Sequence, residues 1–131
     1  MIPKILTVDD SKTIRMILAR LFRPFVCELH EAGNGEEGLA MAGREKPSLI
    51  ILDYNMPVMD GVTMLRLLRE NEDLKKTPVI MLTADSSAEI ISIVARLGVR
   101  DYITKPFNED QLLAKVSRLI ILERRQEGKN E

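Results

Sequence analysis

The chain has 131 residues, of which 45% are hydrophobic, 30% charged and 4% aromatic. This composition fits one globular domain and leaves no room for a second. The formal net charge of −1 gives no overall attraction to nucleic acid or to an anionic membrane, and no apolar stretch is long enough for a membrane helix. We therefore expect a cytoplasmic protein without direct nucleic-acid contact or membrane insertion.

Five short apolar, β-branched runs have the length of β-strands. They span residues 4–8, 26–31, 49–52, 79–82 and 101–104. Apolar residues recur at helical spacing around 14–21, 39–42, 64–68, 90–97 and 112–120. Residues that cap helices precede these stretches: Ser11, Asn34 or Gly35, Asp60, Ser86 or Ser87, and Asn108. The alternation favours an α/β fold with helices on both faces of a parallel sheet.

We assign residues 1–122 to this domain and the charged residues 123–131 to a C-terminal tail or the start of a linker. The predicted strands also contain the cysteine and the histidine of the chain. The single cysteine, Cys27, excludes an internal disulfide and is expected to be a buried, inert thiol. The single histidine, His30, is expected to be an exposed strand residue without a functional role.

Polar side chains stand at the ends of four predicted strands. They are Asp9 and Asp10, Asp53, Thr83, and Lys105. The carboxyl ends of parallel strands share one edge, where open α/β sheets bind ligands, so these side chains are expected to converge. Three neighbouring carboxylates repel one another unless a cation neutralises them, and oxygen ligands without a nearby histidine or cysteine select Mg²⁺.

A metal ion, a lysine, a hydroxyl and an acceptor carboxylate are the groups needed for phosphoryl transfer. Asp53 is the predicted acceptor, because it ends the central strand and a carboxylate can form an acyl phosphate. Asp9 and Asp10 are predicted to hold the metal ion. Lys105 and Thr83 are better suited to bind the incoming anion.

Four segments in order resemble the receiver domain of two-component response regulators, the CheY-like family. They are VDDS (8–11), LDYNMPVMDG (52–61), MLTA (81–84) and DYITKPF (101–107). The resemblance covers residues 3–122 and implies a flavodoxin-like, doubly wound sheet of five parallel strands in the order 2-1-3-4-5 with five helices. It further implies a signalling switch, not an enzyme, in which a sensor histidine kinase phosphorylates Asp53 in a Mg²⁺-dependent reaction.

The same resemblance implies the metal ligands. Asp10, the Asp53 carboxylate and the backbone carbonyl of Asn55 would bind Mg²⁺, and Asp9 would act largely through water.

The resemblance also implies residues for the switch. Thr83 and Lys105 would contact the phosphoryl group, and Thr83 with the aromatic Tyr102 would transmit its presence. Asn55 and Asp85, two residues beyond Asp53 and Thr83, are expected to tune the lifetime of the phosphoryl group.

The predicted output surface comprises the fourth helix, the fifth strand and the fifth helix, at 87–97, 101–104 and 109–122. Its candidate residues are Ile90, Ile91, Ile93, Tyr102 and Leu113. A downstream protein or a second copy of the chain would bind there, although scattered exposed isoleucines are also ordinary on surfaces without a partner.

Two other function classes compete with this interpretation. Residues 33–38 spell G-x-G-x-x-G, the pattern of a dinucleotide-binding turn, but Glu36 and Glu37 would place negative charge where a pyrophosphate should bind. A haloacid-dehalogenase-like phosphatase would normally place a second aspartate two residues after the nucleophile, where this chain has Asn55.

Overall fold

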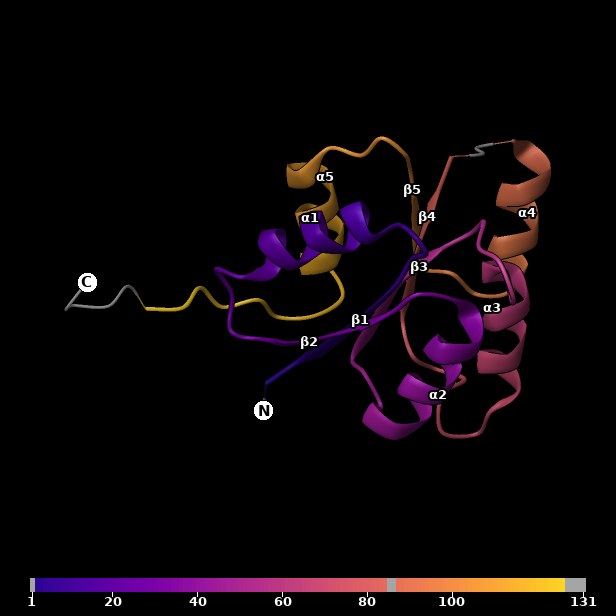
Figure 1. The fold of residues 1–131 in the computed structure, drawn as a ribbon, viewed down its shortest axis with the longest axis horizontal. Coiled ribbons are helices and arrows are strands. Elements are labelled where there is room, and N and C mark those ends of the chain that lie inside the picture. Colours follow the sequence, from indigo (N-terminus) through magenta and orange to yellow (C-terminus); the bar gives the residue numbers. More distant parts are fainter. Residues whose placement is uncertain (1, 85–86, 127–131) are drawn as a thin grey trace.

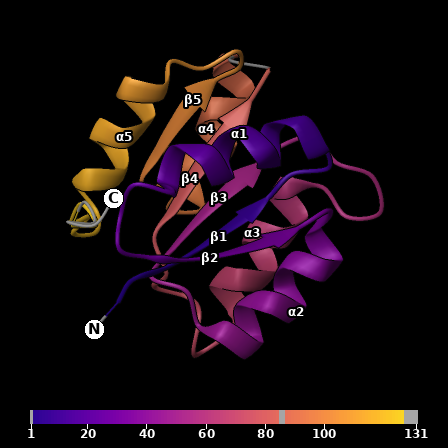
Figure 2. The same cartoon turned by 60° about the vertical axis from the view of Figure 1, so that its left-hand side comes forward.

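Strands and helices alternate along the chain in the computed structural model, which describes residues 2–84 and 87–126 (Figure 1). The strands are β1 (Lys4–Val8), β2 (Glu28–Ala32), β3 (Leu49–Asp53), β4 (Val79–Thr83) and β5 (Asp101–Thr104). The helices are α1 (Lys12–Phe22), α2 (Gly35–Glu45), α3 (Gly61–Glu70), α4 (Ala88–Arg96) and α5 (Glu109–Ser117). The strands form one parallel sheet in the order β2-β1-β3-β4-β5 (Figure 2), which confirms the predicted fold class and strand order.

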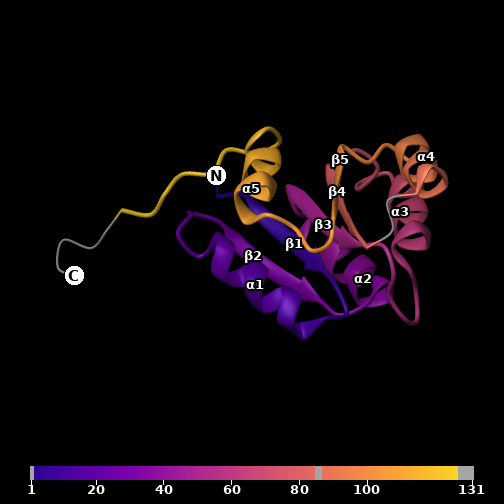
Figure 3. The same ribbon diagram turned by 90° about the horizontal axis from the view of Figure 1, so that it is seen from above.

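Helices cover both faces of this sheet. Helices α1 and α5 lie on one face, and α2, α3 and α4 lie on the other (Figures 1 and 3). Neighbouring strand residues point to opposite faces, so Ile5 packs with Leu18 and Leu112 on the α1–α5 side, whereas Leu6 packs with Met64 on the α3 side. Every residue of β3 and β4 is buried, as expected for strands covered on both faces.

Each helix begins at a residue whose side chain accepts a hydrogen bond from a backbone N–H in the first turn. These capping residues are Ser11, Asn34, Asp60, Ser87 and Asn108. Of the two predicted caps for α2, the capping residue is Asn34 and not Gly35. Ser86, the alternative cap for α4, lies outside the described residues. Local side-chain chemistry therefore fixes where the helices start.

The chain after the last helix packs back against the domain. Helix α5 ends at Ser117, and the chain then turns back to the loop between α1 and β2. There the Val26 N–H donates to the Glu123 carbonyl at 2.7 Å, and the Arg125 N–H donates to the Pro24 carbonyl at 2.8 Å. Residues 123 and 125, in the predicted tail, are therefore hydrogen-bonded to the loop between α1 and β2.

One arginine joins several loops at the amino edge of the sheet. The guanidinium of Arg69, near the end of α3, donates to the backbone carbonyls of Leu97, Gly98, Lys75 and Thr77 at 2.8–3.2 Å. Its burial lowers its pKa below the usual arginine value. The C-terminal end of α4 and the loop before β4 are thereby held by a single side chain.

The start of α3 lies directly against the end of β3. A methyl group on Gly61 would collide with the backbone carbonyl of Asp53 and would lie 2.9 Å from the Cα of Tyr54. The Gly61 N–H also donates to the Tyr54 carbonyl at 2.8 Å. Glycine is therefore required where α3 begins, beside the strand end that carries Asp53.

We predict opposite effects for two glycine-to-alanine substitutions. Gly61→Ala should lower the free energy of unfolding by about 1–3 kcal/mol, since the added methyl group meets rigid backbone. Gly43→Ala within α2 should raise it by about 0.5–1 kcal/mol, because nothing lies within 4 Å of the new methyl group and alanine favours the helix. Urea denaturation measures both, and equal effects at the two positions would contradict the close approach at Gly61.

Candidate functional site

Three carboxylates gather at the carboxyl edge of the sheet. The structure brings Asp9 and Asp10, which follow β1, next to Asp53 at the end of β3, with a ligand oxygen from each within 4.8 Å of the others. Asp9 is 1% exposed and Asp53 is 4% exposed, whereas Asp10 is exposed. The convergence predicted from the strand ends is present, with two carboxylates buried and one facing solvent.

Backbone groups fix the orientation of the buried Asp9. Its N–H donates to the Ala32 carbonyl of β2 at 3.0 Å, and its Oδ1 accepts from the Ser11 N–H at 2.9 Å. The guanidinium of Arg15 donates to the Asp9 carbonyl at 2.6 Å. The turn between β1 and α1 therefore holds Oδ1 and leaves Oδ2 facing the cluster.

The ammonium of Lys105 lies between the two buried carboxylates. Its Nζ is 3.0 Å from Asp9 Oδ2 and 3.1 Å from Asp53 Oδ1. The lysine is held in place by its backbone N–H, which donates to the Thr83 carbonyl at 2.8 Å, and it precedes a cis peptide bond to Pro106. One ammonium faces three carboxylates here, so Lys105 alone does not neutralise the cluster.

This crowding changes the protonation of both partners. Burial, together with the negative charge of Asp9, raises the pKa of Asp53 to about 6, although Lys105 and a backbone hydrogen bond from Asn55 oppose the rise. Burial would lower the pKa of Lys105, but the hydrogen bonds and charges of Asp9 and Asp53 raise it above the usual lysine value. The site therefore holds a firmly charged ammonium beside a carboxylate that is costly to ionise.

The residues predicted to sense the phosphoryl group lie on β4, which pairs with β3, and on β5, which pairs with β4. Thr83 ends β4 and is 2% exposed, and Tyr102 on β5 is half-buried against the α2–α4 core. Tyr102 is paired in register with Met81, two residues before Thr83, so Thr83 and Tyr102 occupy the same face of the sheet. Asn55 is exposed in the loop after β3, and Asp85 lies outside the described residues.

The predicted output surface needs one correction. Ile90 is only 9% exposed and belongs to the core, because it lies on the inward stripe of α4 together with Val94. Ile91 and Ile93 are half-buried, and Leu113 packs partly against the α1–α5 core. The apolar surface of α4 is thus confined to residues beside that stripe.

The glycine pattern of residues 33–38 has a packing explanation. A methyl group on Gly35 would lie 2.7 Å from the Met59 carbonyl, and one on Gly38 would lie 2.9 Å from the Met64 side chain. The Glu37 N–H at the start of α2 already donates to the Asn34 side chain at 2.9 Å. The glycines therefore let α2 pack closely, which removes the main support for a dinucleotide site.

The Cys27 thiol is half-buried, and burial raises its pKa. Its sulfur lies 3.8 Å from the Phe22 carbonyl. This environment suits the unreactive thiol predicted from the sequence, although its burial is only partial.

Comparisons with known proteins identify the class. Residues 5–117 match the family model of the response regulator receiver domain, and the chain belongs to that family of CheY-like two-component signalling domains. It is 38% identical over 117 residues to the chemotaxis protein CheY-3 of Vibrio cholerae, covering 88% of this chain and 90% of the relative. It is 37% identical to the chemotaxis protein CheY of Pseudomonas aeruginosa, covering 88% and 94% of the two chains. The solved structure of Vibrio cholerae CheY4 superposes with a TM-score of 0.86 at 34% identity, covering 92% of this chain and all of that one.

Among the helices of residues 2–84 and 87–126, none has the length and apolar character to cross a membrane.

We predict that Asp53→Asn stabilises the protein in EDTA at neutral pH. The raised pKa of Asp53 means that the folded state binds its proton more tightly than the unfolded state does. The resulting stabilisation is fully present below about pH 4 and is lost as the pH rises through about 6. At pH 7 the variant should therefore exceed the wild type by about 1–3 kcal/mol in free energy of unfolding, and the difference should vanish below about pH 4.

Urea denaturation across this pH range in EDTA measures the effect. Asp60→Asn is the matched control, because Asp60 is an exposed capping residue and asparagine caps helices equally well. Asp53→Asn and Asp60→Asn curves with the same pH dependence would contradict the assigned electrostatic cost.

Proposed function

We propose that this receiver domain accepts a phosphoryl group from a sensor histidine kinase onto Asp53 in a Mg²⁺-dependent reaction. The observation that carries the proposal is the position of Asp53, with Asp9 and Asp10 on one side and Lys105 bound to its carboxylate. A buried carboxylate beside an ammonium can accept a phosphoryl group, because the ammonium stabilises the negative charge of the acyl phosphate that forms.

The donor set fits a hard divalent ion. Three carboxylates are opposed by one ammonium, and the nearby donors are oxygens, as Mg²⁺ requires. Asp10, Asp53 and the backbone carbonyl of Asn55 would hold the ion, with Asp9 acting through water. When bound, Mg²⁺ supplies positive charge that offsets the repulsion between the carboxylates and the incoming phosphoryl oxygens.

The remaining steps use the side chains of the chain itself. An Asp53 oxygen attacks the phosphorus of the phosphohistidine, the new O–P bond forms as the N–P bond breaks, and the imidazole leaves with a proton from water. Lys105 turns from the carboxylates toward the new phosphoryl oxygens, because it is already within 3.1 Å of Asp53. Thr83 donates a hydrogen bond to the same group.

The phosphoryl group would then act through the face shared by Thr83 and Tyr102. Movement of Thr83 toward the phosphoryl group frees space beside Met81, with which Tyr102 is paired. Inward rotation of Tyr102 would favour a second arrangement of α4, β5 and α5 by population shift. The domain thus works as a switch for a downstream protein or a second copy of the chain, and it does not turn over an external substrate as an enzyme does.

Direct phosphorylation tests the acceptor. Incubation with acetyl phosphate and Mg²⁺ should add one phosphoryl mass to the wild type and none to Asp53→Asn, with EDTA abolishing the reaction. Asp60→Asn, which removes an exposed carboxylate seven positions away on the chain, should be labelled like the wild type. Intact-mass spectrometry measures the added mass in all three proteins, and undiminished labelling of Asp53→Asn would show that Asp53 is not the acceptor.

The output surface is tested separately. Replacing Ile91 and Ile93 with serine should leave phosphorylation unchanged and weaken self-association, or binding of a downstream target, at least about fivefold. Sedimentation velocity with beryllofluoride as the phosphoryl mimic measures self-association. Met16→Ser, at a 62% exposed position on the opposite face of the sheet, is the matched control. Association and target binding that both persist undiminished in the Ile91/Ile93 variant would reject this surface.

A further inference from the structure

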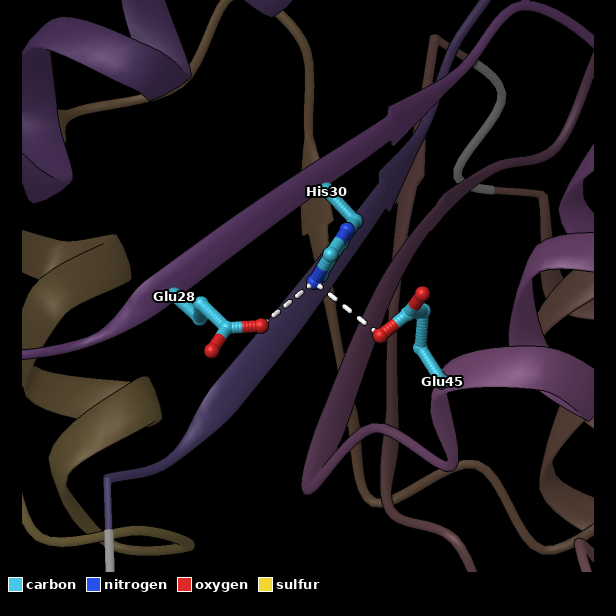
Figure 4. Close-up of side chains that lie close together, drawn as sticks. All are labelled: Glu28, His30 and Glu45. Carbon is cyan, nitrogen blue, oxygen red and sulfur yellow. Dashed lines mark hydrogen bonds and ion pairs between the residues drawn. The ribbon is translucent and has the colours of Figure 1, made fainter.

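A second cluster of metal-ligand side chains lies at the amino edge of the sheet, away from Asp53. Glu28 and His30 project from β2, and Glu45 is the last residue of α2 (Figure 4). The Nε2 atom of His30 is 2.9 Å from Glu28 Oε1 and 3.5 Å from Glu45 Oε1. All three ligand atoms lie within 4.8 Å of one another.

The fold creates this cluster from two elements. Glu28 and His30 are two residues apart on an edge strand, so both face the side of the sheet that α2 covers. The end of α2 brings Glu45 to the same place. His30 and Glu45 each have 22% of their side chains exposed, so the histidine predicted to be exposed is in fact sheltered and paired.

We propose that Glu28, His30 and Glu45 bind one divalent transition-metal ion of the zinc class. Metal–ligand bonds of about 2.0–2.2 Å place neighbouring ligands about 2.8–3.6 Å apart in tetrahedral or octahedral sites. The two distances from His30 Nε2, 2.9 Å and 3.5 Å, already lie close to that range. An imidazole ligand favours Zn²⁺, Cu²⁺ or Ni²⁺ over Mg²⁺.

The same place already attracts a cation within the chain. The ammonium of Lys4 lies 3.3 Å from Glu45 Oε1 and 3.3 Å from the Glu45 backbone carbonyl, at the negative end of α2. Arg44 lies 3.5 Å from the other oxygen, Oε2, which leaves Oε1 directed to Lys4 and His30. Lys4 therefore competes for the ligand oxygen that the metal ion needs.

Coordination requires a modest rearrangement. His30 must present the Nε2 lone pair, with its proton on Nδ1, and Lys4 must turn away from Glu45. The Lys4 side chain is 36% exposed, so solvent can receive its ammonium. The bound ion would join β2 to α2 and leave at least one coordination position for water.

Isothermal titration of Zn²⁺ into the untagged chain tests this site, with excess Mg²⁺ present to occupy the Asp9, Asp10 and Asp53 cluster. We expect one saturable site. His30→Gln and Glu45→Gln should each weaken Zn²⁺ binding at least about 10-fold. Lys4→Met should strengthen it roughly 2- to 5-fold, because the competing ammonium is gone.

Glu31→Gln is the matched control, since Glu31 lies on the same strand but pairs with Arg15 on the α1 side of the sheet. It should bind Zn²⁺ like the wild type.

Thermal unfolding provides a second measurement. Zn²⁺ should raise the Tm of the wild type but not that of His30→Gln, and unchanged phosphorylation of His30→Gln shows that this variant is folded. Absence of saturable binding, or binding that survives both ligand variants and is lost only in Cys27→Ser or Asp53→Asn, would overturn the proposal.

Discussion

Two buried carboxylates share one ammonium at the carboxyl edge of the sheet, and the proposed chemistry of the domain depends on this imbalance. Asp9 and Asp53 face the same Lys105 Nζ at 3.0 Å and 3.1 Å. The exposed Asp10 adds a third negative charge to the cluster. A cluster that repels itself favours any added cation, and a bound cation in turn makes room for an anion that Lys105 can hold.

The fold maintains this unfavourable arrangement by fixing the backbone around it. The turn after β1 is held by hydrogen bonds from Asp9 to Ala32 and from Ser11 to Asp9. The end of β3 is held by contact with Gly61, where α3 begins. Because the strand ends cannot separate to relieve the repulsion, the electrostatic cost would be available for coupling to the proposed binding of a metal ion and a phosphoryl group.

Sequence reasoning succeeded where the signal is local. Local sequence determines where strands end, which residues cap helices and which polar groups follow strands. The parallel topology then brings Asp9, Asp53 and Lys105 together. It failed where tertiary contacts decide. The Val26 N–H pairs with the Glu123 carbonyl of the predicted tail, and no periodicity in either segment encodes that pairing. The meeting of His30 with Glu45 depends on where α2 ends in space, so the histidine could not be recognised as a cluster residue.

The four carbonyl contacts of Arg69 have a mechanical consequence for α4. They hold the residues just after this helix, Leu97 and Gly98, to α3 and to the loop before β4. The opposite end of α4 follows β4, whose last residue, Thr83, lies at the carboxyl edge of the sheet. A helix held at one end tilts about that end more easily than it slides, so we expect any displacement of α4 to be greatest near Ser87 and smallest near Leu97. In such a movement Arg69 would fix the pivot, although it lies at the edge of the sheet opposite the carboxylate cluster.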